Sequence, residues 1–206
     1  MTTEDKNMEV QILEIAENLF LKQGFAKTTM SQIANEVGCN KALVHYYYRS
    51  KDKLFDRIFE EKAKFLLNNL LNTETEGDTF LDKLIMIIRT HFDFLKENPK
   101  IPAFLFNELS TNPDRMKLFI EKIIAQFHPL EMLEEMNKEL QEEIMKGNIR
   151  PVSIIDLLIS ILCLNITPFL AKPFILSLHP DNQQIDFVFE NRKEETVQLI
   201  LARLKP

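Results

Sequence analysis

The sequence predicts an all-α protein, and three observations support this fold class. Apolar residues recur at three- and four-residue spacing along most of the 206 residues, and no convincing period-two alternation indicates a strand. Only four glycines are present, none near another, so tight hairpin turns have few sites. The same scarcity excludes the glycine-rich phosphate loops of dinucleotide-binding and P-loop proteins. With 45% hydrophobic and 27% charged residues, the composition is that of a folded globular chain.

The first two helices are predicted from an apolar stripe, a capping box and two glycines that end helices. Residues 9–22 place apolar side chains on one face, and Gly24 ends that helix. Thr29 and Gln32 form a capping box that opens a short second helix. Gly38 ends this second helix, because glycine takes the positive φ that the following turn needs.

Two more helices come directly after the turn. Asn40 is expected to cap a short third helix whose inward residues are Val44 and Tyr48. Ser50 caps a fourth helix, with apolar residues at three-four spacing as far as Leu70. The second and third helices, joined by a glycine turn, have the spacing of a helix-turn-helix.

The remainder of the chain predicts further helices. They cover residues 78–97, 114–127, 130–146, 152–171 and 185–204. A polar break over residues 72–77 and the prolines separate them, namely Pro99, Pro102, Pro113, Pro173 and Pro180. Because residues 78–97 carry two apolar stripes, this helix is expected at the centre of a bundle.

The compartment is predicted from the cysteines and the apolar segments. Cys39 and Cys163 lie in apolar surroundings and are expected to be buried free thiols, with no metal or cofactor site. The polar, acidic N-terminus lacks the pattern of a signal peptide. The longest apolar stretch, residues 152–171, contains Asp156 and Asn165, which are costly in lipid. We therefore expect a soluble, cytoplasmic protein with no membrane partner.

Charge is unevenly distributed along the chain. The net charge is −6, yet residues 22–53 hold six basic and two acidic residues, a local charge of +4. This basic island coincides with the helix-turn-helix spacing. A short helix that presents a small residue, a cation and aromatic side chains outward suits the major groove of DNA. The outward residues of the third helix are expected to be Lys41, Ala42, His45, Tyr46 and Tyr47.

Residues 28–54, TTMSQIANEVGCNKALVHYYYRSKDKL, resemble the DNA-binding domain of the TetR family of bacterial repressors. The likeness is carried by Thr29, Ile33-Ala34, Val37-Gly38-Cys39-Asn40, Val44-His45-Tyr46-Tyr47-Tyr48 and Ser50-Lys51, and it extends over about residues 9–60. His45, Tyr47, Asn40 and Ala42 depart from the usual tyrosine, histidine, serine and glycine. Both His45 and Tyr47 keep a donor for a phosphate oxygen, but the base sequence recognised can differ from that of relatives.

Roles are assigned from the chemistry of each side chain. Lys51 and nearby backbone amides are expected to meet one phosphate, and His45 and Tyr47 others. Met30 contributes its backbone amide, and Thr29 and Ser31 approach the flank of the site. Lys41, Ala42 and Tyr46 are candidates for base edges. The predicted DNA-binding residues are Thr29, Met30, Ser31, Lys41, Ala42, His45, Tyr46, Tyr47 and Lys51.

The resemblance also implies a homodimer whose C-terminal half binds a small molecule and then releases DNA. It divides the chain into a DNA-binding domain, residues 1–50, and an effector-binding and dimerisation domain, residues 51–206. Independently, residues 152–170 are apolar in nearly every direction, which favours a covered second surface over a fully internal helix. The predicted interface residues are Ile155, Leu158, Ile159, Leu162, Val197, Ile200, Leu201 and Leu204.

The effector is expected to be apolar or amphipathic. Aromatic and methionine side chains between the helices, with a few polar groups in apolar surroundings, are the candidates, although such residues belong to a core far more often than to a pocket. They are Phe65, Met86, His91, Phe92, Phe104, Phe106, Asn107, Met116, Phe127, His128 and Asn165.

Two other classes of function stay open at this point. No HExxH, GxSxG or supported carboxylate pair indicates an enzyme, but an all-α enzyme or carrier is one alternative. A helical adaptor that binds only proteins is the other, although it would not need the basic island. The resemblance favours a repressor, while activators also occur.

Overall fold

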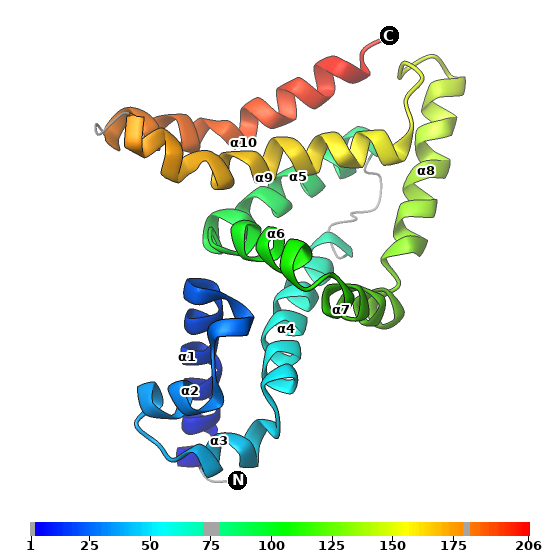
Figure 1. The fold of residues 1–206 in the computed structure, drawn as a ribbon. Coiled ribbons are helices and arrows are strands. Elements are labelled where there is room, and N and C mark those ends of the chain that lie inside the picture. The colour runs from blue at the N-terminus through cyan, green and yellow to red at the C-terminus, as the bar shows by residue number, and fades with distance from the viewer. Residues whose placement is uncertain (1–2, 72–78, 179–181) are drawn as a thin grey trace. The chain divides into compact units, whose positions relative to one another are not determined.

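The computed structural model describes residues 3–71, 79–178 and 182–206, and every regular element assigned in them is a helix (Figure 1). These are α1 (Thr3–Lys27), α2 (Met30–Val37), α3 (Lys41–Tyr48), α4 (Lys51–Leu71), α5 (Phe80–Glu97), α6 (Ile101–Thr111), α7 (Pro113–Phe127), α8 (Pro129–Met145), α9 (Ile154–Leu178) and α10 (Asn182–Leu204). The all-α prediction is therefore confirmed.

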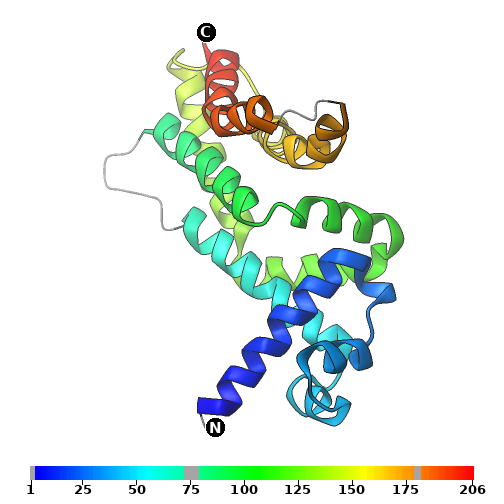
Figure 2. The same cartoon turned by 90° about the vertical axis from the view of Figure 1, so that its left-hand side faces the viewer.

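The chain packs as two compact units. Unit 1 comprises residues 1–64 and 103–123, and unit 2 comprises residues 65–102 and 124–206. In unit 1, α6 and α7 lie beside α1 and the first part of α4 (Figure 2). The core of unit 1 consists of apolar side chains from α1, α2, α3, α4, α6 and α7. It includes Ile12, Phe20, Ile33, Val44, Phe55, Phe104 and Met116.

The helix caps of unit 1 agree with the predicted chemistry. Thr29 Oγ1 accepts from the Gln32 amide at 3.1 Å, and Gln32 Oε1 accepts from the Thr29 amide at 2.9 Å. Gly38 has φ 79° at the end of α2. Asn40 Oδ1 accepts from the Leu43 amide at 2.8 Å, and Ser50 Oγ accepts from the Lys53 amide at 3.2 Å. These interactions confirm the capping box and both single caps.

The first helix is longer than expected. Its backbone leaves helical geometry at Gly24, where φ is 83°, as the prediction of a helix end requires. The chain then continues with one more helical turn to Lys27, and the N-terminal part begins at Thr3 rather than at residue 9. Gly24 is therefore a kink between two helical segments.

Unit 2 is built around α5, which contacts α8, α9 and α10. This position confirms the inference from its two apolar stripes. Figure 1 shows α9 and α10 side by side, and they are the helix pair with the most extensive contact. The core contains Leu84, Ile88, Leu140, Leu157, Ile161 and Ile200.

Prolines give a wrong prediction in two places. The expected break at Pro99 is confirmed, since α5 ends at Glu97, but the break expected at Pro102 is wrong. Helix α6 begins at Ile101 with Pro102 in its first turn, where the missing N–H costs no hydrogen bond. The predicted end of α9 at 171 and turn at Pro173 are wrong, because α9 continues to Leu178. Both Pro168 and Pro173 lie inside this helix, so neither proline ends it.

The two thiols differ from each other. Cys39, which was expected to be buried, is half-buried against the core of unit 1. The prediction of a buried Cys163 is wrong, because this side chain lies on the exposed face of α9. The predicted polar break at 72–77 and the turn at Pro180 lie outside the described residues.

Candidate nucleic-acid interface and ligand site

The turn between α2 and α3 is tightly bonded. The Cys39 amide donates to the carbonyl oxygen of Ala34 at 2.9 Å, and the Gly38 amide donates to Asn35 at 3.2 Å. The side chain of Ala34 is buried, and its small size suits the close approach of the two helices. This arrangement fixes α3 against α2 as a helix-turn-helix requires.

The third helix presents the predicted face. Val44 and Tyr48 are buried, and the Tyr48 hydroxyl donates to the carbonyl oxygen of Glu9 at 3.3 Å. Lys41, Ala42 and His45 are exposed, and Tyr46 is 78% exposed. These inward and outward residues are as expected, whereas Tyr47, which was expected to point outward, is half-buried.

Tyr47 supports its neighbour. It is half-buried and packs against the core of unit 1. The rings of Tyr46 and Tyr47 meet edge to face with centroids 5.4 Å apart. Since Tyr47 is anchored on one side, this contact restricts the rotamers of the exposed Tyr46 ring.

The His45 ring is tied to the end of α3. Its Nδ1 lies 3.0 Å from the carbonyl oxygen of Arg49, so Nδ1 carries the proton and donates. In the neutral ring Nε2 is then an acceptor. A phosphate oxygen also only accepts, so the predicted phosphate contact of His45 requires the protonated ring.

Arg49 is a cation that the sequence prediction missed. It is exposed at the end of α3 with φ 54°, an uncommon backbone angle for a residue with a side chain. Its position within the basic island of residues 22–53 could have indicated Arg49 as a DNA-contacting residue.

Lys51 has a structural role beside its predicted one. Its Nζ donates to the carbonyl oxygens of Phe25 and Thr28, each at 2.8 Å, and lies 4.1 Å from the centroid of the Phe25 ring. Burial lowers the pKa of the Lys51 amine. The ammonium group therefore joins the start of α4 to the end of α1, with one N–H left for a phosphate.

A buried ion pair completes this junction, and sequence reasoning did not find it. The Glu108 carboxylate accepts from the Phe25 amide at 3.1 Å and is paired with Arg115. The Arg115 guanidinium lies 3.7 Å from the centroid of the Phe25 ring, so that ring is in contact with two cations. Glu108 and Arg115 are far from residue 25 in sequence, and α6 itself was not expected.

The start of α2 agrees with the expected geometry. Thr29 and Ser31 are exposed, whereas the Met30 side chain is 8% exposed. A contribution from the Met30 backbone rather than from its side chain is consistent with this burial.

The predicted effector residues are divided between the units. In unit 1, Phe104 and Met116 are part of the core, and Phe106 and Asn107 are exposed. The other seven belong to unit 2: Phe65, Met86, His91, Phe92, Phe127, His128 and Asn165. No single described cavity brings these residues together.

Two of these residues do contact each other. Asn165 is fully buried on α9, and its Nδ2 donates to His91 Nδ1 at 3.2 Å and to the carbonyl oxygen of Ile88 at 3.0 Å. Burial lowers the pKa of His91 to about 4, so its ring is neutral. This pair satisfies buried polar groups between α5 and α9.

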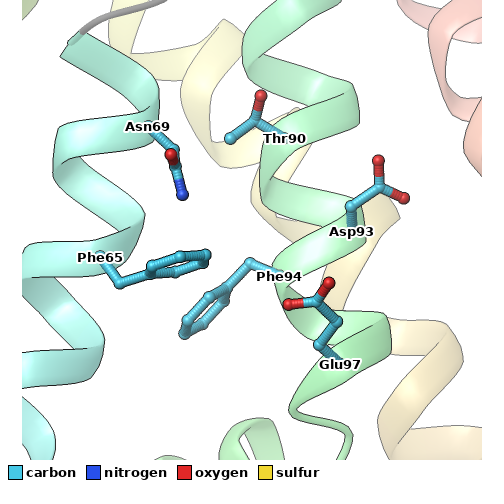
Figure 3. Close-up of a pocket in the computed structure, with 6 residues that line it drawn as sticks. All are labelled: Phe65, Asn69, Thr90, Asp93, Phe94 and Glu97. Atoms are coloured by element: carbon cyan, nitrogen blue, oxygen red, sulfur yellow. The ribbon is translucent and has the colours of Figure 1, made fainter.

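A pocket of about 270 Å³ lies between the end of α4 and α5 (Figure 3). Its lining residues are Phe65, Asn69, Thr90, Asp93, Phe94 and Glu97. Figure 3 shows Phe65 and Asn69 reaching from α4 towards α5. Of the predicted effector residues only Phe65 lines this pocket. Within the described parts of the chain, no group of three metal-ligating side chains is present.

The predicted dimer residues also fall into two groups. Ile155 and Ile159 on α9 are 51% and 52% exposed, and Leu162 is exposed too. Leu158 and Leu201 are half-buried, whereas Val197, Ile200 and Leu204 are buried in the core of unit 2. Leu199, which was not predicted, is exposed on α10. Leu199 could not be predicted from the apolar stripe of this helix, because it is an isolated apolar residue outside that stripe.

One helix has the length and composition of a membrane span. α9 has a mean hydropathy of 2.1 over its most apolar stretch, and 22% of that stretch is buried. The same properties occur in core helices of soluble proteins, so they are weak evidence for a membrane. Because so little of this stretch is buried, much of the apolar surface of α9 is uncovered in a single chain.

Comparisons with known proteins place this architecture. Residues 12–58 match the sequence profile of the bacterial regulatory proteins of the tetR family. The nucleoid occlusion factor SlmA of Mannheimia succiniciproducens is 26% identical over 129 residues, or 59% of each chain. The chain thus spans little more than half the length of this relative.

Two further proteins extend the likeness. The biofilm operon icaADBC negative transcriptional regulator IcaR of Staphylococcus aureus is 24% identical over 139 residues, or 68% of each chain. The crystal structure of HlyIIR, a hemolysin II transcriptional regulator, matches 98% of this chain and 99% of its own, with a TM-score of 0.63 and 22% identity. The latter likeness shows a shared fold.

The α2–α3 pair and its exposed basic and aromatic face define a helix-turn-helix DNA-binding protein. Residues 12–58 match the DNA-binding domain of the TetR family of bacterial transcriptional regulators, and the chain as a whole has the fold of such regulators. Proteins of this family are non-enzymatic transcription factors that act on operator DNA as dimers.

Proposed function

We propose that the protein is a ligand-responsive repressor that binds a palindromic operator as a homodimer through α3. The observation that carries this proposal is the outward face of α3, where Lys41, Ala42, His45 and Tyr46 are exposed within a segment of charge +4. A polyanionic duplex attracts such a basic segment.

The DNA contacts divide by chemistry. Lys41, Ala42 and Tyr46 meet base edges, with Lys41 suited to guanine and Ala42 to a thymine methyl group. Lys51, Arg49, His45 and Tyr47 meet phosphates, together with the Met30 amide. Thr29 and Ser31, exposed at the start of α2, meet the adjacent backbone.

The homodimer is inferred from the uncovered surface of α9. Ile155, Ile159 and Leu162 are exposed at three-four spacing, and a second copy of the chain would bury them. A lipid environment is disfavoured because Asp156 and Asn165 lie within this helix. The same reasoning supports a soluble protein that acts in the cytoplasm.

The functional division of the chain is proposed at residue 50, with DNA binding before it and effector binding and dimerisation after it. Packing groups residues differently, because α6 and α7 share the core of unit 1. The two divisions describe different properties, since α6 and α7 support the DNA-contacting helices without reaching DNA themselves in this proposal.

Selection of duplexes from a random library tests the proposal. We expect an enriched palindrome with half-sites about one helical turn, or roughly 34 Å, apart or a related spacing. Tyr46→Ala should relax the preference at particular base pairs of this palindrome, and Glu135→Gln, an exposed change on α8, should leave the preference intact. Failure of the wild type to enrich any duplex would contradict operator binding. An enzyme or a protein-only adaptor is not favoured, and reporter expression with and without the protein separates repression from activation.

A further inference from the structure

The pocket between α4 and α5 has an unusual combination of linings. Two phenylalanine rings, Phe65 and Phe94, form one part of it, with centroids 6.5 Å apart. The polar lining residues are Asn69, Thr90, Asp93 and Glu97. Two of these carry carboxylates, and no lysine, arginine or histidine is among the lining residues.

The two carboxylates are not equivalent. Asp93 is paired with Lys193 of α10, with Nζ–O distances of 2.9 Å and 3.1 Å. No ion pair in the described part of the chain involves Glu97, which is exposed at the end of α5. One lining charge is therefore compensated by the protein and the other is not, so the pocket keeps a negative charge.

The rings add to this preference. The face of a phenylalanine ring attracts a cation through its quadrupole, by about 0.5–2 kcal/mol. Phe65 is 53% exposed, so its ring is available to a ligand. Aromatic faces beside an uncompensated carboxylate suit an organic ammonium group attached to an apolar body, and they disfavour a carboxylate-bearing ligand.

We infer that this pocket binds a small organic cation, an amine or quaternary ammonium compound with an aromatic or apolar body. A volume of about 270 Å³ holds roughly ten non-hydrogen atoms, at about 30 Å³ for each atom of the size of water. As the site of the effector, the pocket rests on the proposed function. As a cation site, it is supported independently by its aromatic rings and by the Glu97 carboxylate, which has no ion-pair partner among the described residues.

Three probes that share one ring test the inference: phenethylammonium, 2-phenylethanol and phenylacetate. Calorimetric titration of the full-length protein should give the order ammonium, alcohol, carboxylate, with the ammonium compound at least tenfold tighter than the carboxylate. Glu97→Gln should remove most of this difference. Glu135→Gln, the same charge change outside the pocket, should preserve it, and Phe65→Leu should weaken the ammonium compound alone.

Each result bears on the inference. Equal or tighter binding of phenylacetate, an order unaffected by Glu97→Gln, or no binding of any probe at millimolar concentration would overturn it. Operator affinity is measured separately. A probe that binds through Glu97 without changing operator affinity leaves the cation site intact and refutes the effector role. If operator binding does respond, DNA must weaken the probe by the same factor.

Discussion

The Nζ of Lys51 donates a hydrogen bond of 2.8 Å to the carbonyl oxygen of Thr28, directly before the capping box of α2. This bond links the first residue of α4 to the entry of the helix-turn-helix. A side chain expected to hold DNA thus also holds the elements that present DNA-binding groups, and its removal has two separable effects.

Lys51→Ala should therefore weaken binding to all duplex sequences about equally and also lower thermal stability. One fewer phosphate contact should reduce the slope of log K against log salt by about 1. Fluorescence anisotropy at several salt concentrations gives the slope, and a thermal melt gives the stability. Lys53→Ala, a nearby exposed lysine, is the control and should leave the melt unchanged. Wild-type stability and salt dependence in Lys51→Ala would refute both roles.

Base recognition should depend on Lys41 and Tyr46. Loss of a good base contact costs about 1–3 kcal/mol of discrimination, so Lys41→Ala or Tyr46→Ala should relax the preference at particular base pairs. Competition between the selected operator and single-base variants measures this. If both substitutions lower affinity uniformly for every duplex, these residues contact only the backbone.

Dimerisation is best tested on exposed positions. Ile159→Asp should yield a monomer of about 24 kDa in sedimentation, and operator binding should fall in parallel because a monomer presents one short helix. Met145→Asp adds the same charge at an exposed apolar residue of α8 and should stay dimeric. Ile200→Asp is less informative, since Ile200 is buried and a charge at this position should destabilise unit 2 itself. A monomeric wild type at micromolar concentration would contradict the proposed assembly.

Breaking the buried pair at Phe25 should destabilise unit 1. Glu108→Gln leaves Arg115 without its charge partner, and loss of one member of a buried pair costs about 3–5 kcal/mol. Urea unfolding measures the difference. Glu121→Gln, in an exposed pair with Lys117, should cost less than about 1 kcal/mol. Equal effects of the two substitutions would show that the buried pair has no special weight.

Stability should also depend on His91 and pH. Its pKa falls from 6.5 to about 4 on folding, so between these values the unfolded chain binds more protons than the folded one. The contribution of His91 to the free energy of unfolding is therefore constant above about pH 6.5, and it falls as the pH drops from 6.5 towards 4. The loss reaches about 3 kcal/mol, at about 1.4 kcal/mol per pKa unit.

His91→Asn keeps an acceptor for Asn165 but cannot titrate in this range. Its denaturation midpoint should change less between pH 7 and pH 4.5 than that of the wild type, although its stability at pH 7 is lower. His128→Asn, at an exposed position, should retain the wild-type pH dependence. An identical pH profile for His91→Asn would show that this ring is not the group responsible.

Features fixed by neighbouring residues could be predicted from sequence. The capping box at Thr29, the turn at Gly38 and the two faces of α3 depend on contacts within a few residues, and the structure confirms them. The cluster of Glu108, Arg115 and Phe25 could not be predicted, because it joins residues 83 positions or more apart. The pocket carboxylates were missed for the same reason: on sequence alone, Asp93 and Glu97 resemble any solvated helix face.

The DNA-binding unit has a consequence for synthesis on the ribosome, because its residues are not contiguous in the chain. Its core includes Phe104 and Met116, and the bond to the Phe25 amide comes from Glu108. The first 64 residues therefore emerge without a complete core and must wait for about 60 more. At about 5–20 residues per second this interval lasts several seconds, during which the helix-turn-helix is exposed to chaperones and proteases.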